Sequence, residues 1–218
     1  VGSLSLARRF AEENEEGDIE LTDEEVARTV LLPSIRFVND TTLWGSVGPL
    51  SGGRSSLAIS QSIGLGTDFR YLTAIADFRR YMRIGARPSL ATNPVLARSS
   101  QPDAQNFYVG GVNSIRGYDD FEFSGHNAAL MTVELRYPFI DNLTIASPIP
   151  LSIWGLGGVM LADLGAAWDG YFRAVTRDDA VRFKDIKASY GIGARMRFGY
   201  FILRYDLAWP TDLQTKGE

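Results

Sequence analysis

The stretch GGVNSIRGYDD, residues 110–120, holds the side chain with the clearest capacity for chemistry. Arg116 stands between isoleucine and glycine, in a segment whose glycines and short polar residues are typical of a loop. A guanidinium carries five N–H donors in a planar fork and can bridge two carboxylates. From these residues alone, Arg116 is either an ordinary exposed loop arginine or the partner of acidic groups elsewhere in the chain.

Residue types that carry much of enzyme chemistry are scarce. The chain has no cysteine, which excludes disulfides and thiolate zinc sites, and its single histidine, His126, disfavours a histidine metal site or a Ser-His-Asp triad. There is no G-x-S-x-G motif, and the GLG, GLGG and GIG stretches suit strands and turns better than phosphate loops. We therefore expect no enzyme activity, no metal, no cofactor and no bound nucleotide. A soluble β-rich enzyme is the least favoured alternative.

The charge balance narrows the possible partners. The 22 basic and 26 acidic residues give a formal net charge of -4, so nucleic acid is not expected as a partner. No apolar run approaches the ~18 residues of a transmembrane helix.

Hydrophobic residues recur with a period of two over long stretches. In residues 185–198 the even positions are apolar or aromatic, whereas the odd positions carry lysine, serine, glycine and arginine. The alternation resumes with opposite parity over residues 201–209, where Arg204 and Asp206 take the polar face. This pattern predicts two strands joined at Gly199 as a hairpin.

The same alternation recurs upstream. It covers residues 127–139, 70–83 and 54–63, and more weakly 31–39, 88–98 and 151–168. The total is about eight strands, each near the ~9–11 residues that cross a bilayer when tilted. A soluble sandwich has strands nearer ~5–6 residues. Charged residues on one face and apolar residues with terminal aromatics on the other favour a transmembrane antiparallel β-barrel over a sandwich.

The predicted connections differ in length. Long polar loops are expected at residues 7–29, 99–125 and 169–184, and short links near Gly66, Gly85 and Gly199. Outer-membrane barrels have short periplasmic turns and long external loops, which places the three long loops outside. The acidic run EENEEGDIELTDEE, residues 12–25, could bind divalent cations, but a solvated external loop is the preferred interpretation.

Four blocks in order carry a resemblance to a known family: NFYVGGVNSIRGYDDFEF, NAALMTVELRYPF, GVMLADLGAAWD and ASYGIGARMRFGYFILRYDLAWP. They resemble the C-terminal part of the BamA/TamA-like superfamily of outer-membrane assembly barrels, the bacterial surface antigen domain. The resemblance covers about residues 31–212. It implies a long loop that folds back into the barrel and touches acidic residues of the inner wall.

The resemblance assigns the loop tip to Ser114, Ile115, Arg116, Gly117 and Tyr118. It assigns the inner-wall partners to Glu134 and Asp163. The period-two pattern independently puts Glu134 on the polar face and is compatible with an inward Asp163. A glycine at 117 allows a close backbone turn where a Cβ would clash. This set is expected to be a structural latch and not a catalytic site.

The resemblance also implies a role and a location. It implies insertion or translocation of other proteins at the bacterial outer membrane; the alternative is a structural barrel that anchors an extracytoplasmic domain or larger assembly. Expected partners are outer-membrane lipid, lipopolysaccharide, and other protein chains or further parts of the same barrel.

Because the family barrel has sixteen strands, the chain is expected to be an internal fragment. Its expected divisions are an acidic external loop with the end of a preceding strand (1–30), barrel strands (31–212) and the start of a further loop (213–218).

Overall fold

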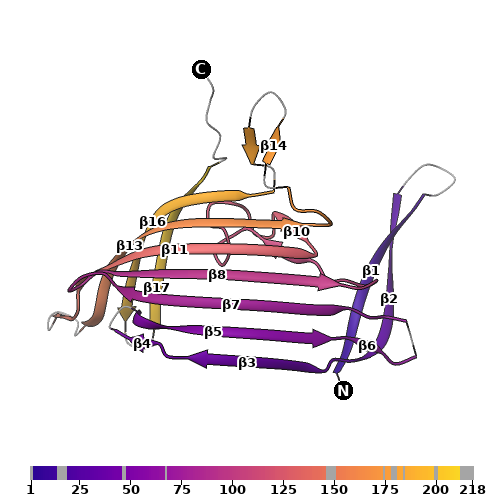
Figure 1. The fold of residues 1–218 in the computed structure, drawn as a ribbon, viewed down its shortest axis with the longest axis horizontal. Coiled ribbons are helices and arrows are strands. Elements are labelled where there is room, and N and C mark those ends of the chain that lie inside the picture. Colours follow the sequence, from indigo (N-terminus) through magenta and orange to yellow (C-terminus); the bar gives the residue numbers. More distant parts are fainter. Residues whose placement is uncertain are drawn as a thin grey trace.

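A ten-stranded antiparallel sheet dominates the structure (Figure 1). The structure is a computed structural model that describes residues 2–13, 19–45, 48–66, 68–145, 151–173, 175–177, 181–183, 185–198 and 201–211. Eight strands follow one another across the sheet in chain order: β3 (Ser34–Asp40), β5 (Pro49–Gln61), β7 (Leu72–Arg83), β8 (Ser89–Ser100), β11 (Asn127–Ile140), β13 (Leu151–Trp168), β16 (Lys187–Phe198) and β17 (Phe201–Thr211). The two-residue β4 (Leu43–Trp44) and the three-residue β12 (Leu143–Ile145) pair with β5 and β13.

The all-β, antiparallel prediction is confirmed, and each predicted strand from residue 31 onward has a counterpart in the sheet. Every pair along the eight-strand path is antiparallel. The predicted turn at Gly199 and the segment 213–218 lie outside the described residues. Within the part of the chain that the structure covers, no helix has the length and hydropathy needed to cross a membrane.

The two faces of the sheet differ in chemistry, as the period-two pattern predicts. On β17, Tyr205 and Trp209 are 65% and 47% exposed, and on β16 Tyr190 is 57% exposed. On the opposite face, Glu134 of β11 and Asp163 of β13 are buried. A belt of exposed aromatic and aliphatic side chains backed by a charged face is the arrangement of a membrane barrel wall, because lipid contacts the apolar side.

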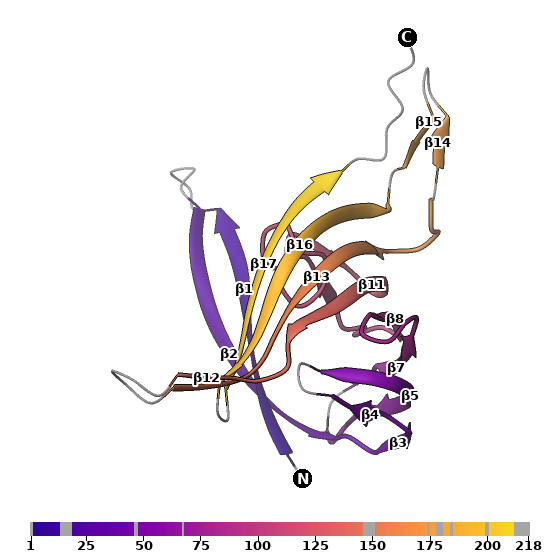
Figure 2. The same ribbon diagram turned by 90° about the vertical axis from the view of Figure 1, so that its left-hand side faces the viewer.

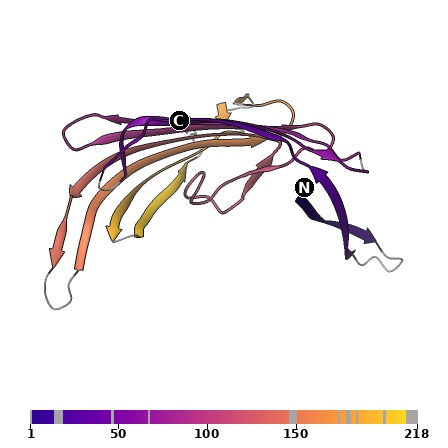
Figure 3. The same cartoon turned by 90° about the horizontal axis from the view of Figure 1, so that it is seen from below.

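The sheet curves into an arc, and the connection between β8 and β11 lies beneath it on the concave side (Figures 2 and 3). This connection, residues 101–126, contains the short hairpin strands β9 (Phe107–Val109) and β10 (Phe123–Gly125). The small core lies between the connection and the inner wall, where Val109, Ile115 and Ala128 are buried together. The predicted long segment 169–184 includes a second short hairpin, β14 (Val175–Arg177) with β15 (Val181–Phe183).

The N-terminal segment differs from the predicted acidic loop. The structure pairs β1 (Gly2–Glu13) with β2 (Ile19–Leu31), and β2 with β6 (Ile63–Gly64), in a separate three-stranded sheet. The register places Arg8 opposite Glu24 and Arg9 opposite Asp23. Charge composition predicted a loop, whereas the backbone of this segment forms paired strands.

Candidate functional site

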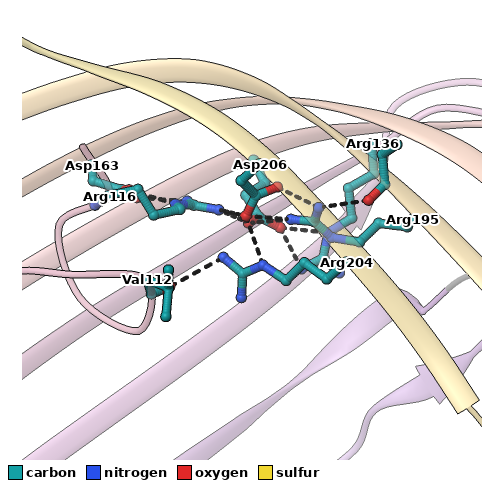
Figure 4. Close-up of polar contacts among 9 residues, drawn as sticks. Val112, Arg116, Arg136, Asp163, Arg195, Arg204 and Asp206 are labelled. Carbon is teal, nitrogen blue, oxygen red and sulfur yellow. Dashed lines mark hydrogen bonds and ion pairs between the residues drawn. The ribbon is translucent and has the colours of Figure 1, made fainter. Parts of the chain in front are cut away.

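A network of charged side chains lies where the tip of the 101–126 connection meets the inner wall (Figure 4). We call it the Arg116 cluster. Its members are four arginines and three carboxylates: Arg116 from the connection, Glu134 and Arg136 from β11, Asp163 from β13, Arg195 from β16, and Arg204 and Asp206 from β17. Four neighbouring strands of the sheet are therefore linked to one loop.

Arg116 binds Asp163 through one edge of its guanidinium, with two parallel hydrogen bonds. Nε donates to Oδ2 at 2.6 Å and Nη2 donates to Oδ1 at 2.7 Å. The backbone N–H of Arg116 also lies 3.2 Å from Oδ2. Arg116 is 4% exposed and Asp163 is 1% exposed. A paired, charge-assisted contact of this kind fixes the direction of the guanidinium as well as its position.

The remaining guanidinium nitrogen of Arg116 is directed to Glu134. Nη1 donates to Oε1 at 2.7 Å, and Oε2 accepts bonds of 2.9 and 2.8 Å from Arg136. Burial would lower the pKa of Arg116, but its hydrogen bonds with Asp163 and Glu134 outweigh burial, so its pKa lies above the ordinary arginine value. The guanidinium therefore stays charged.

Asp206 extends the cluster onto β17. Its Oδ2 lies 3.3 Å from Nη1 of Arg116 and accepts a 2.6 Å bond from Nε of Arg204. Arg195 also pairs with Asp206 and places Nη2 3.5 Å from Oε1 of Glu134. Arg204 in turn donates to the backbone carbonyl of Val112 at 3.4 Å, a second contact between β17 and the loop.

The strand register explains why Glu134 and Asp163 can share one guanidinium. Asp163 is opposite Thr132 in the β11–β13 ladder, so Glu134 is two residues from the facing position on the same face. Such diagonal neighbours lie ~7–8 Å apart, a gap that a guanidinium can bridge. The alternation of each strand thus presents both carboxylates to the concave side at the height of the loop tip.

The rest of the tip is fitted to the wall by packing. Ile115 is fully buried, and a Cβ at Gly165 of β13 would lie 2.5 Å from its Cδ1. Gly117 has a φ of +91°, and a Cβ there would lie 3.0 Å from the carbonyl oxygen of Ala208. Both glycines therefore allow the loop backbone and the wall to approach closely.

Two polar side chains complete the tip. The Ser114 hydroxyl accepts from the Gly110 amide and donates to the Gly110 carbonyl, both at 2.7 Å, which closes the loop on itself. Tyr118 donates to the backbone carbonyl of Ala188 at 3.2 Å. The tip residues therefore contact β11, β13, β16 and β17: Arg116 reaches three of these strands, and Tyr118 reaches β16.

The chemistry of this site is ion pairing. Across the described residues, no group of three or more His, Cys, Asp or Glu side chains is placed to hold a metal ion. His126 lies apart from the cluster, with Nδ1 2.6 Å from Oδ1 of the exposed Asp169. Each carboxylate in the cluster contacts one or more guanidinium groups.

The structure brings together the seven residues that the family resemblance assigned to the loop tip and the inner wall. Ser114, Ile115, Arg116, Gly117 and Tyr118 form the tip, and Glu134 and Asp163 are its wall contacts. Sequence reasoning did not assign Asp206, Arg136, Arg195 or Arg204 to the site. The sequence did indicate that these charged residues lie on the polar face of β11, β16 and β17. It did not indicate which of them would be close enough to form ion pairs with one another.

The sequence matches the Omp85 superfamily domain over residues 38–218. The chain belongs to the Omp85 superfamily. This agrees with the resemblance to BamA/TamA-like barrels found in the sequence. No curated protein sequence matches the chain. Omp85 proteins are bacterial outer-membrane proteins, with a general role in protein insertion or translocation there. The eight-strand path is thus part of an Omp85 barrel wall, and the concave face that holds the Arg116 cluster is its inner face.

Proposed function

We propose that the chain forms part of a barrel that inserts or translocates other proteins at the outer membrane, and that the Arg116 cluster latches the 101–126 connection to the inner wall. The observation that carries the latch is the burial of Arg116 between Asp163 and Glu134, with bonds of 2.6 and 2.7 Å. A solvated loop arginine would have no such paired and buried partners.

The energetic argument follows from that burial. Breaking a buried ion pair by removing one partner typically costs ~3–5 kcal/mol, because the other charge stays buried without compensation. The connection can therefore leave the wall only by exposing all three of its carboxylate contacts to water. A latch of this kind holds the loop inside the barrel while a client protein passes along or through the wall.

The test uses the intact protein in a lipid bilayer. Arg116→Ala is compared with Arg54→Gln, a matched control on the inner wall whose half-exposed arginine lies 3.8 Å from Asp40 and outside the cluster. Two quantities are measured: protease cleavage within residues 110–120, and the rate at which an outer-membrane client folds into the same bilayer.

The latch predicts faster cleavage and slower client folding for Arg116→Ala, with no change in Arg54→Gln. Faster cleavage with unchanged client folding would favour the anchoring barrel, because the loop would then matter only for the stability of the wall. A loop that stays protected in Arg116→Ala would overturn the latch itself.

A further inference from the structure

A second basic site lies on the same concave face, at the end of the sheet where residues 84–88 join β7 to β8. We call it the turn-end cavity. It has a volume of about 270 Å³ and is lined by four arginines, Arg83, Arg87, Arg136 and Arg195, but by a single carboxylate, Asp141.

The arginines of the turn-end cavity are not all neutralised. Arg136 and Arg195 are paired with carboxylates of the Arg116 cluster, but Arg83 forms no ion pair with any residue that the structure describes. Arg87 donates to the carbonyls of Pro138 and Phe139 at 3.1 Å, and lies 3.5 Å from Asp141. Both Arg87 and Asp141 are well exposed to solvent, so this ion pair is weak and offsets little of the positive charge of the cavity.

The two sites together carry more positive than negative charge. The Arg116 cluster and the turn-end cavity together hold six arginines and four carboxylates, a formal difference of +2. Guanidinium groups grouped in a concavity attract anions, because low-dielectric walls focus their field. The planar guanidinium fork matches both carboxylate and phosphate groups, and carboxylate is the anion that a polypeptide side chain supplies.

The other residues that line the turn-end cavity indicate what kind of anion would fit there. Leu50, Pro49, Pro138 and Val159 supply apolar surface beside the arginines. The inward faces of β11 and β16 supply Arg136 and Arg195, so the cavity opens to the barrel interior and not to the lipid side. We propose that the turn-end cavity binds an acidic side chain, next to an apolar one, of a polypeptide inside the barrel. This proposal rests on the proposed handling of client polypeptides.

The test measures peptide binding to the intact protein in detergent. The probe is a fluorescent six-residue peptide of alternating glutamate and leucine, followed by anisotropy, with a lysine-and-leucine peptide of the same length as its control. We expect the acidic peptide to bind at least about tenfold more tightly, and its affinity to fall as salt rises. Arg83→Gln and Arg87→Gln are each expected to weaken binding roughly three- to tenfold, whereas Arg54→Gln is not.

Equal binding of the two peptides, or equal effects of the Arg83 and Arg54 substitutions, would overturn the proposal. The assay requires neither client insertion nor an intact latch. If peptide binding fails while Arg116→Ala still slows client folding, only the turn-end cavity is wrong. If the acidic peptide binds but the Arg116→Ala result is negative, the cavity stands and the latch does not.

Discussion

The Arg116 cluster and the turn-end cavity use the same residue type on the same wall in two different ways. In the cluster, four arginines meet three carboxylates, and Arg116 is almost completely buried. In the cavity, four arginines meet one lining carboxylate, and Arg83 and Arg87 are exposed. Two of the arginines, Arg136 and Arg195, belong to both sites, so the two sites are adjacent.

The difference shows what burial and charge balance decide. A nearly neutral cluster with a buried centre holds structure together, because loss of a buried member such as Arg116 leaves an unpaired charge away from water. An unbalanced, hydrated group of arginines contributes little to stability and keeps its donors available for a ligand. The following substitutions test this contrast, in order of decreasing expected effect on stability.

Arg116→Ala should have the largest effect, because it leaves Asp163 buried with no other ion-pair partner among the described residues and removes one of the arginines paired with Glu134. We expect a loss of about 3–5 kcal/mol in the free energy of unfolding. Urea titration of the intact protein in detergent, followed by tryptophan fluorescence, measures it. Arg116→Lys keeps the charge but not the fork and should recover only part of the loss. Full recovery by lysine would show that the paired geometry is unimportant.

Ile115→Ala should come next. The side chain is fully buried against Gly165 and Leu130, so truncation leaves a cavity between loop and wall. We expect a loss of about 2–3 kcal/mol, at the low end for such truncations because a loop can partly collapse into the space. Ile115→Val, measured in the same urea titration, should cost about 1 kcal/mol. Similar losses for alanine and valine would argue against tight packing.

Gly117→Ala should have a smaller effect. The φ of +91° disfavours any Cβ, and the backbone of Ala208 lies in the way. We expect a loss of about 1–2 kcal/mol, together with faster proteolysis at residues 110–120. Gly66→Ala is the matched control: its φ is +81°, but no atom lies within 4 Å of the added Cβ. Equal proteolysis of the two variants would mean that contact with β17 does not hold the tip.

Arg83→Gln should have the smallest effect on stability, below about 0.5 kcal/mol, because it removes an exposed charge that has no ion-pair partner among the described residues. The same variant should clearly weaken binding of the acidic peptide. A large loss of stability would show that Arg83 belongs to the structural network and would remove the contrast between the two sites.

Much of this architecture follows from local pattern. The alternation in β11, β16 and β17 is long enough to fix which side chains face inward, because a strand has a strict period of two. That parity, with the family resemblance, was sufficient to name Glu134 and Asp163 as partners of Arg116. The residues 1–30 were harder, since their charge suggested a solvated loop, whereas the structure pairs β1 with β2.

The remaining members of the site were beyond reach for a physical reason. Whether Asp206 meets Arg116 depends on strand stagger and on how far the loop descends into the arc. The alternation of apolar and polar residues predicts which face of the sheet a side chain lies on. It does not predict the position of that side chain along the barrel axis relative to side chains of other strands. The turn-end cavity is similar: Arg83 and Arg195 are separated by more than a hundred positions and become neighbours only through the curvature of the sheet.

The contact between Arg116 and Asp206 also bears on the order in which the molecule assembles. The two residues are 90 positions apart, and Asp206 lies on a strand at the edge of the described sheet. Contacts of such long range form late, because the intervening chain must be ordered before they contribute. Arg116 can meet Asp163 once β11 and β13 have paired, but it meets Asp206 only after β16 and β17 are in register. We therefore expect the loop tip to join the wall in two stages, with the contact between Arg116 and Asp206 formed only after β17 has paired with β16.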